Sequence, residues 1–369
     1  MRFTFFRVSR ESEVAANETP NPDRPCPTSR PVLQPLQQAQ KRCPLPRAQW
    51  RPTGYPELVG TVAPPGQLVD VRGFRLHVHC GGAGAPSIVL DAALGGSSVS
   101  WSLVQPELAK VSRVCSYDRA GFGWSDAGPM PRTACRIADE LRTLLERAGI
   151  PPPYLLVGHS FGGLVSLIFA HRFRDDVAGL VLVDPAHAED WVKPAPKEQV
   201  KIDRGVRLCR YGAITARLGL ARAVAALVGI GQLTLARGLV RVVSRGGLSR
   251  EDEAILAPVW KLPPEVRPAL PQFWTKPQFF AALGSQIESI CVSAAQVLEA
   301  TASGFGDLPL VTISSTNPGA YRLHQQDALA RLSTRGRHIM ASNSGHWIPL
   351  DQPGVVIDAV REVVGVVRA

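Results

Sequence analysis

From residue 67 to the end of the chain, short apolar runs alternate with segments of helical periodicity. The apolar runs are short enough for strands, and glycine, proline or polar residues bound them. They occupy residues 67–82 (two strands around Arg72-Gly73), 87–94, 113–118, 154–160, 177–185, 307–315 and 337–346. Buried strands that alternate with helices are typical of a parallel sheet covered on both faces. The sequence therefore predicts an α/β fold with a mostly parallel, eight-stranded sheet flanked by helices.

The helices of this pattern are most distinct between the fourth and fifth apolar runs. Residues 133–149 place apolar side chains at helical spacing, at Ile137, Leu141 and Leu144. Thr133 can cap the start of this helix, and Gly149 can end it. Residues 162–173 and 354–367 carry further helix-like patterns.

Two stretches break the alternation. Residues 1–55 are rich in Pro, Gln and Arg, and because proline removes backbone donors we expect a disordered tail there. Residues 190–303 carry helix-like patterns and no clear buried strand. An insert of this size between two strands predicts a helical cap over the carboxyl ends of the sheet, where sites form. The core would then comprise residues 56–189 and 304–369.

The chain has a formal net charge of +10, and the position of this charge limits the function classes. The excess of Lys and Arg lies in the tail and in residues 190–300, whereas the core is nearly neutral. A neutral core argues against a nucleic-acid partner. The basic insert would suit an anionic substrate or a membrane surface, although a solvated helix face is the simpler interpretation. No apolar run is long enough to predict a membrane-spanning helix.

The cysteines of the chain form no recognisable motif. There are seven, an odd number, and no two have C-x-x-C spacing. This pattern argues against a disulfide framework or a zinc site and favours a reducing compartment. The sequence thus predicts a cytoplasmic location.

The segment "YLLVGHSFGGL" joins an apolar run to a helix-like run through Gly158-His159-Ser160-Phe161-Gly162. This G-x-S-x-G pattern between a strand and a helix is typical of a serine nucleophile on a sharp turn. Small neighbours let the turn close, and the following helix directs its free N–H groups toward the reacting oxygen. We therefore predict that Ser160 is a nucleophile.

A serine nucleophile needs a base, and the base needs a carboxylate that orients it. His346 follows the last predicted strand, so it should lie at the same sheet edge as Ser160, and it is the preferred base; His187 is a distant second. Asp184 ends its strand at that edge and is favoured as the acid over Asp327, which lies beyond the next strand. His159 adjoins the serine, but its side chain should leave the turn in another direction.

Other residues near the predicted strand ends have candidate roles. The N–H of Phe161, and that of Leu94 ahead of Gly95-Gly96, are candidates to bind the developing oxyanion. His77 and His79 share one strand face, for which packing is a better explanation than a metal site.

The sequence resembles the α/β-hydrolase superfamily from about residue 64 to residue 367. The matching segments are "LDAALGGSSVSW", "SYDRAGFGWSD", "VGHSFGGLV", "LVLVDPAH" and "SGHWIPLDQP", in the family's order of Ser, acid and His. Ala92-Ala93 replaces the family's frequent His-Gly at the oxyanion loop, and the acid follows an earlier strand than usual. The resemblance also implies structural rather than catalytic roles for Asp118 and Arg119.

These residues predict a serine hydrolase that cleaves an ester or related acyl bond through an acyl-enzyme. Such chemistry requires no metal or organic cofactor, and the expected partner is a small-molecule substrate, an apolar ester. Haloperoxidase-like, peptidase and lyase activities use similar residues and remain alternatives. A further alternative is a non-catalytic ligand-binding protein with the same fold.

Overall fold

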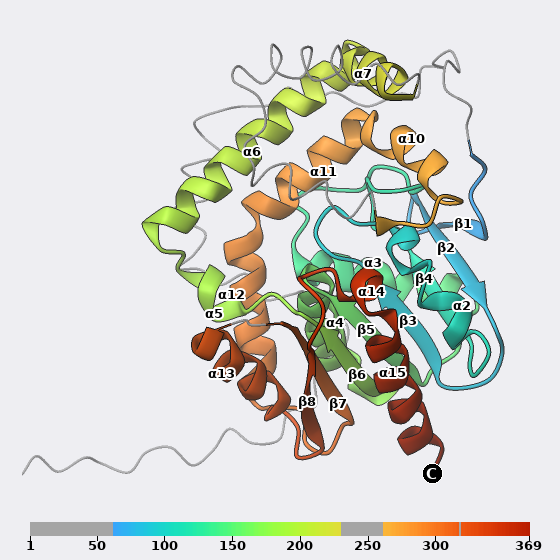
Figure 1. Cartoon of the computed structure of the whole chain (residues 1–369), viewed down its shortest axis with the longest axis vertical. Coiled ribbons are helices and arrows are strands. Elements are labelled where there is room, and N and C mark those ends of the chain that lie inside the picture. The colour runs from blue at the N-terminus through green and yellow to red at the C-terminus, as the bar shows by residue number, and fades with distance from the viewer. Residues whose placement is uncertain (1–61, 230–260, 317–318) are drawn as a thin grey trace, which may run out of the picture.

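The computed structural model describes residues 62–229, 261–316 and 319–369, so the tail predicted over residues 1–55 lies outside the described residues. The strands form one eight-stranded sheet with the order β1-β2-β4-β3-β5-β6-β7-β8 (Figure 1). Their bounds are β1 Gln67–Asp70, β2 Arg75–Gly81, β3 Ser87–Asp91, β4 Val114–Tyr117, β5 Tyr154–His159, β6 Val177–Val183, β7 Leu310–Ser315 and β8 Gly336–Ala341. The fold class and the positions of the strands are therefore confirmed.

The direction of the strands decides which loops meet. All pairs from β4 through β3, β5, β6 and β7 to β8 are parallel, whereas β1 pairs with β2, and β2 with β4, antiparallel. The carboxyl ends of the parallel strands therefore lie along one edge of the sheet. The residues that follow β5, β6 and β8 meet there.

The strands bury alternate residues in two separate cores. One face carries Val89, Leu156 and Leu182, which pack against α3 (Ala134–Arg147), α4 (Phe161–Arg172) and α12 (Ile290–Thr301). The other face packs against α2 (Gln105–Leu108), α14 (Ile348–Asp351) and α15 (Pro353–Arg368). Helix α3 begins as predicted: the Thr133 hydroxyl accepts a hydrogen bond from the Arg136 N–H at 3.4 Å.

The described part of residues 190–303 is helical. It contains most of α5 (Ala188–Val192), then α6 (Pro196–Arg217), α7 (Leu220–Gly229), α10 (Leu270–Trp274), α11 (Pro277–Glu288) and α12. Helices α6 and α11 lie side by side outside the sheet (Figure 1). A Cβ at Gly121, in the loop after β4, would stand 2.4 Å from the Cβ of Ala282, so α11 packs closely on that loop. The predicted cap and domain boundaries stay predictions.

Two buried ion pairs hold the loops that follow β3 and β4 at the carboxyl edge of the sheet. Asp118 contacts His77 at 2.9 Å and accepts the N–H of Ser98 at 2.6 Å. Arg119 contacts Asp91 at 2.7 Å, and both side chains are almost fully buried. Asp118 and Arg119, although adjacent in the sequence, thus each pair with a different buried residue. His77 also bonds the carbonyl of Pro65.

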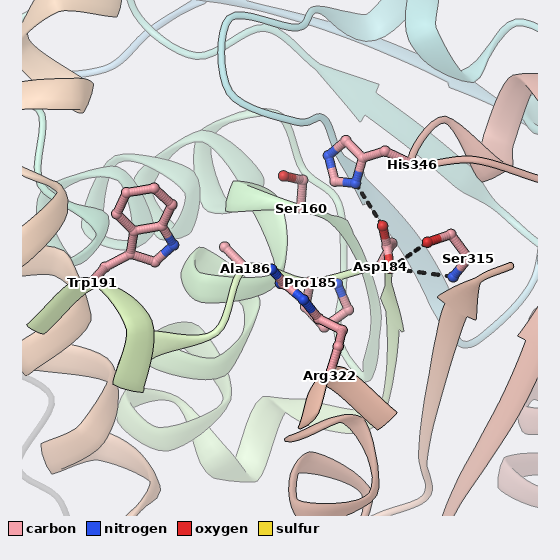
Figure 2. Close-up of a pocket in the computed structure, with 8 residues that line it drawn as sticks. All are labelled: Ser160, Asp184, Pro185, Ala186, Trp191, Ser315, Arg322 and His346. Atoms are coloured by element: carbon pink, nitrogen blue, oxygen red, sulfur yellow. Dashed lines mark hydrogen bonds and ion pairs between the residues drawn. The ribbon is translucent and has the colours of Figure 1, made fainter. Parts of the chain in front are cut away.

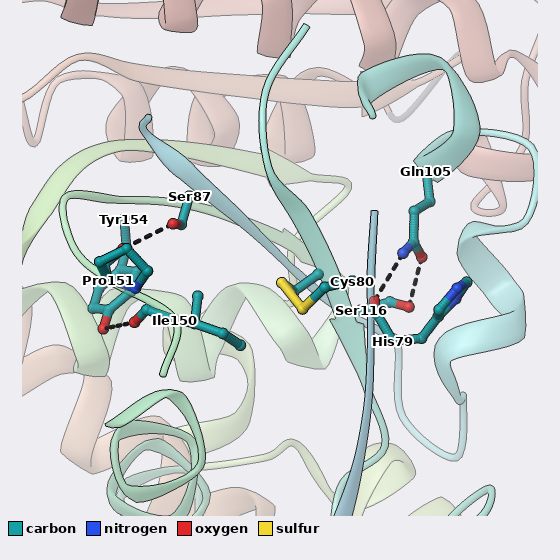
Figure 3. The surroundings of a disulfide bond; sticks show 9 residues. His79, Cys80, Ser87, Gln105, Ser116, Ile150, Pro151 and Tyr154 are labelled. Atoms are coloured by element: carbon teal, nitrogen blue, oxygen red, sulfur yellow. Dashed lines mark hydrogen bonds between the residues drawn. A yellow bond between two sulfur atoms is a disulfide. The ribbon is translucent and has the colours of Figure 1, made fainter. Parts of the chain in front are cut away.

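A disulfide links Cys80 of β2 to Cys115 of β4, although the cysteine pattern of the sequence argued against a disulfide framework (Figure 3). The two residues face each other directly across the antiparallel pair, with their Cα atoms 4.1 Å apart. Beside them the Gln105 side chain bonds both the Ser116 hydroxyl of β4 and the His79 carbonyl of β2. The two cysteines are 35 residues apart in the sequence, so their spacing gave no sign that they pair. The cysteines therefore no longer favour a reducing compartment.

In the described residues, no helix combines the length and the apolar character needed to span a membrane. The predicted cytoplasmic location stays a prediction.

The disulfide should contribute measurably to stability. Replacing both partners, Cys80→Ala and Cys115→Ala, frees a loop of 35 residues in the unfolded chain. We expect the free energy of unfolding to fall by about 2–4 kcal/mol. Urea unfolding without reductant measures this difference, and Cys291→Ala, which removes a free thiol, is the matched control. A double variant as stable as the Cys291→Ala control would contradict the prediction.

Candidate active site

Ser160 stands on a strained turn between β5 and α4. Its backbone has φ 54° and ψ −114°, a left-handed conformation that costs a non-glycine residue roughly 1–3 kcal/mol. The surrounding backbone holds it there. The Ser160 N–H donates to the Val183 carbonyl at 3.0 Å, and the Ser160 carbonyl accepts the N–H groups of Gly163 and Ala186 at 3.0 and 3.1 Å. The turn thus projects one hydroxyl from the carboxyl edge of the sheet.

Two glycines of the motif are required by close backbone contacts. A Cβ on Gly158 would lie 2.4 Å from the Gly162 carbonyl oxygen. A Cβ on Gly162 would lie 2.4 Å from the carbonyl oxygen of Asp91, at the end of β3. Since backbone atoms cannot move aside cheaply, only glycine fits at either position. The strand, the turn and α4 therefore pack closely around Ser160.

The loop after β8 brings His346 to the same edge, where it meets Asp184 (Figure 2). His346 Nδ1 lies 2.6 Å from Asp184 Oδ2. The other carboxylate oxygen lies near the Ser315 N–H at 3.3 Å and the Ser315 hydroxyl at 3.4 Å. Figure 2 shows Ser160 beside the His346 ring, and both residues line the same cavity. The structure thus brings together the three residues that the sequence singled out.

The Asp184 carboxylate sets the tautomer of His346. Burial opposes ionisation of Asp184, but the hydrogen bond and charge of His346, with the Ser315 N–H, outweigh it and lower the pKa of the carboxyl group. An ionised carboxylate only accepts hydrogen bonds, so Nδ1 of His346 carries the proton. Its Nε2 is then free to accept a proton from Ser160.

Asp327, the alternative acid, is engaged elsewhere. Its carboxylate lies 2.7 Å from Nδ1 of His338, and Nε2 of that ring lies 2.8 Å from the Ser314 hydroxyl. Ser314 is completely buried, so this second Asp-His-Ser arrangement presents no hydroxyl to a substrate. The carboxylate beside His346 is Asp184.

The predicted oxyanion donors lie directly after Ser160 and in the loop that follows β3. Phe161 begins α4, so its N–H has no partner within the helix. Leu94 lies in the loop after β3. The Arg119 side chain donates hydrogen bonds to two carbonyls of this loop, those of Ala92 and, at 3.3 Å, Ala93. These bonds fix the part of the loop that directly precedes Leu94. An oxyanion role for Phe161 and Leu94 stays a prediction.

His159 has a role that the sequence did not reveal. Its ring is buried beside the strand, and Nε2 lies 2.7 Å from the His346 carbonyl oxygen. A carbonyl only accepts, so His159 Nε2 donates this bond and thereby fixes the loop that carries His346. In the sequence, the only indication that His159 matters to the site was its position directly before Ser160. The sequence predicted that the His159 side chain leaves the turn in a direction that prevents it from serving as the base. Its contact with the His346 carbonyl agrees with that prediction.

A cavity of about 370 Å³ opens at this edge of the sheet. Ser160, Asp184 and His346 line one side of it. The rest of its wall consists of Pro185, Ala186, Trp191, Ser315 and Arg322. Among the described residues, no group of three His, Cys, Asp or Glu side chains is arranged to hold a metal ion.

His187, the second choice as base, is fully buried. Within the described part of the chain, neither of its ring nitrogens has a hydrogen-bond partner. Burial, followed by the charge of Arg322, lowers its pKa to about 4. Burial, followed by the charge of His346, lowers the pKa of His159 to about 3.

Both histidines should make stability depend on pH. Because their folded pKa values lie below 6.5, the unfolded chain binds their protons more tightly. Their stabilisation is complete above about pH 6.5 and falls as the pH drops toward 4, by up to about 1.4 kcal/mol per pH unit for each histidine. Urea unfolding between pH 7.5 and 5 measures this slope.

The variant His187→Leu isolates one of the two contributions. We expect a flatter slope than in the wild type, whereas His324→Leu, which removes an exposed histidine, should leave the slope unchanged. Equal slopes for the wild type and His187→Leu would show that His187 is protonated equally in both states.

Comparisons with known proteins agree with this fold. A family model described as the alpha/beta hydrolase fold matches residues 86–206. Protein YqjL of Bacillus subtilis is 37% identical over 117 residues, which is 31% of this chain and 46% of that protein. An AB hydrolase superfamily protein of Gibberella zeae is 34% identical over 103 residues, 27% of this chain and 32% of that protein. The chain thus spans under half the length of each relative.

Solved structures match over a larger part of the chain. A thermophilic esterase from Thermogutta terrifontis, bound to malate, has a TM-score of 0.53 at 21% identity and covers 82% of this chain and 99% of its own. An enol-lactonase from Burkholderia xenovorans has a TM-score of 0.54 at 22% identity, covering 81% and 100%. At these identities the likeness establishes the fold. The family-model match to residues 86–206 and the similar structures together show that this chain has the alpha/beta hydrolase fold.

Proposed function

We propose that this protein is a serine hydrolase that cleaves a carboxylic ester, or a related acyl bond, through an acyl-enzyme. The observation that carries the proposal is the hydrogen bond of 2.6 Å between His346 Nδ1 and Asp184, beside a serine held at positive φ. This arrangement supplies a nucleophile, a base and the carboxylate that orients the base.

In the first half of the reaction, Ser160 Oγ attacks the substrate carbonyl carbon. As the Oγ–C bond forms, the hydroxyl proton passes to Nε2 of His346 and the carbonyl electron pair moves onto the oxygen. The charge of Asp184 stabilises the imidazolium that results. When the tetrahedral intermediate collapses, the bond to the leaving oxygen breaks and that oxygen takes the proton from Nε2. The products of this half are an alcohol and acyl-Ser160.

The negative charge on the tetrahedral oxygen needs donors that are already in place. We assign this role to the N–H of Phe161 and the N–H of Leu94. Phe161 begins α4, whose amino end is electropositive. Arg119 keeps the Leu94 loop fixed, which supports Leu94 as the second donor. Preorganised donors spare the reaction the cost of reorienting dipoles.

In the second half, water takes the place of the alcohol. His346 Nε2 accepts a proton from water as its oxygen attacks the acyl carbon. Collapse of this second intermediate breaks the bond to Ser160 Oγ, which recovers the proton from Nε2. The acid product then leaves through the cavity. Side chains of the protein carry out every proton transfer in these two half-reactions.

The comparisons support hydrolase activity in general, since the similar structures include an esterase and an enol-lactonase. Both act on ester bonds according to their names. The cavity of about 370 Å³ favours a small-molecule substrate. We propose that the helical segment after β6 forms a cap that restricts access to it.

The variant Ser160→Ala should abolish hydrolysis of a small activated ester such as p-nitrophenyl butyrate. It removes the nucleophile, and we expect a loss of at least about 10³-fold in kcat. Ser315→Ala, which removes a hydroxyl from the same cavity, is the control and should retain far more activity. Undiminished hydrolysis by purified Ser160→Ala protein would rule out the mechanism.

The variants Asp184→Asn and Asp327→Asn separate the two candidate acids. Asn at position 184 would accept or donate in place of a carboxylate and would no longer stabilise the imidazolium, so kcat should fall by about 10³- to 10⁴-fold. Asp327→Asn loses only the contact with His338, and its kcat should stay within a few-fold of the wild type. The steady-state rates of the two variants are compared directly, and the reverse order would overturn the assignment.

A further inference from the structure

One wall of the cavity carries a permanent positive charge that the proposed reaction does not use. Arg322 projects from α13 (Gly319–Ala330) and lines the cavity together with Ser160 and His346. Figure 2 shows its side chain extending from α13 into the pocket, past Pro185 and Ala186. Its side chain retains 44% of its exposure. A guanidinium in this position can reach a substrate bound at Ser160.

The neighbouring carboxylate satisfies Arg322 only weakly. Asp190 Oδ2 lies 3.9 Å from the guanidinium, at the outer limit of an ion pair. Oδ1 of Asp190 instead accepts bonds from Gln325 Nε2 at 2.8 Å and from the Tyr321 hydroxyl at 3.1 Å. Asp190 thus keeps the guanidinium near the cavity without occupying its donors. An Arg side chain has five N–H donors in a planar fork.

The carboxylate that lines the cavity, that of Asp184, is already engaged. Asp184 is bonded to His346 and to Ser315, and its side chain is only 12% exposed. Of the eight residues that line the cavity, Arg322 is the one with a permanent positive charge. Its charge also acts on the interior, since it is the second cause, after burial, of the lowered pKa of His187.

A guanidinium facing a small cavity matches the geometry of a carboxylate, which it binds through two parallel hydrogen bonds. Pro185, Ala186 and Trp191 supply apolar surface to the same cavity. We propose that Arg322 selects substrates with a second, ionised carboxylate, so that the preferred substrate is a monoester of a short dicarboxylic acid. This inference rests on the proposed hydrolase function.

The test compares two activated esters, of which only one ends its acyl chain in an ionised carboxylate. The substrates are p-nitrophenyl hemiglutarate, which carries a free carboxylate, and p-nitrophenyl butyrate, which is neutral. For the wild type we expect a lower KM for the hemiglutarate. In Arg322→Gln the KM for the hemiglutarate should rise by about 10-fold or more, as for a lost charge-assisted hydrogen bond. The KM for the butyrate and the kcat for both esters should change less than about 2-fold.

Arg331→Gln is the matched control, because it makes the same change in charge at an exposed residue just past the end of α13. It should leave both KM values unchanged. If both substrates respond equally to Arg322→Gln, or if the wild type does not favour the hemiglutarate, the proposal for Arg322 fails while the hydrolase function stands. If the wild type cleaves neither ester and Ser160→Ala behaves identically, the proposed function itself fails.

Discussion

The hydrogen bond between His346 and Asp184 is the contact on which the site depends. It spans 162 residues of sequence and joins the loop after β8 to the end of β6. Without it, the imidazole would have neither a defined tautomer nor a neighbouring negative charge. His159 supports the same loop through the His346 carbonyl, and Ser315 supports the carboxylate. Residues at the ends of β5 and β7 therefore hold the backbone of His346 and the carboxylate that its ring contacts.

The sheet makes this contact possible because its strands are parallel. Ser160, Asp184 and His346 follow three different strands, and the parallel order places all three at one edge. On that edge, strain is confined to a few residues: Ser160 and Asp184 both have positive φ. Closely packed glycines and buried ion pairs surround them, so the rest of the fold holds the strained backbone in place.

The sequence predicted the strands and the position of the candidate residues because both follow from local patterns. Apolar runs mark buried strands, and a residue that directly follows a parallel strand must lie at its carboxyl edge. It did not predict the Cys80–Cys115 disulfide, since pairing depends on register between β2 and β4. Nor did it reveal the contact of His159 with the His346 carbonyl or the position of Arg322 in the cavity, which depend on how loops and α13 fold back.

The most direct test of the central claim is covalent labelling of the nucleophile. A fluorophosphonate probe reacts with a serine only where a base activates its hydroxyl, and intact mass followed by peptide mapping identifies the modified residue. We predict one stoichiometric adduct at Ser160, which forms in the wild type and far more slowly in His346→Gln. An unlabelled wild type, or an adduct on another residue, would contradict it.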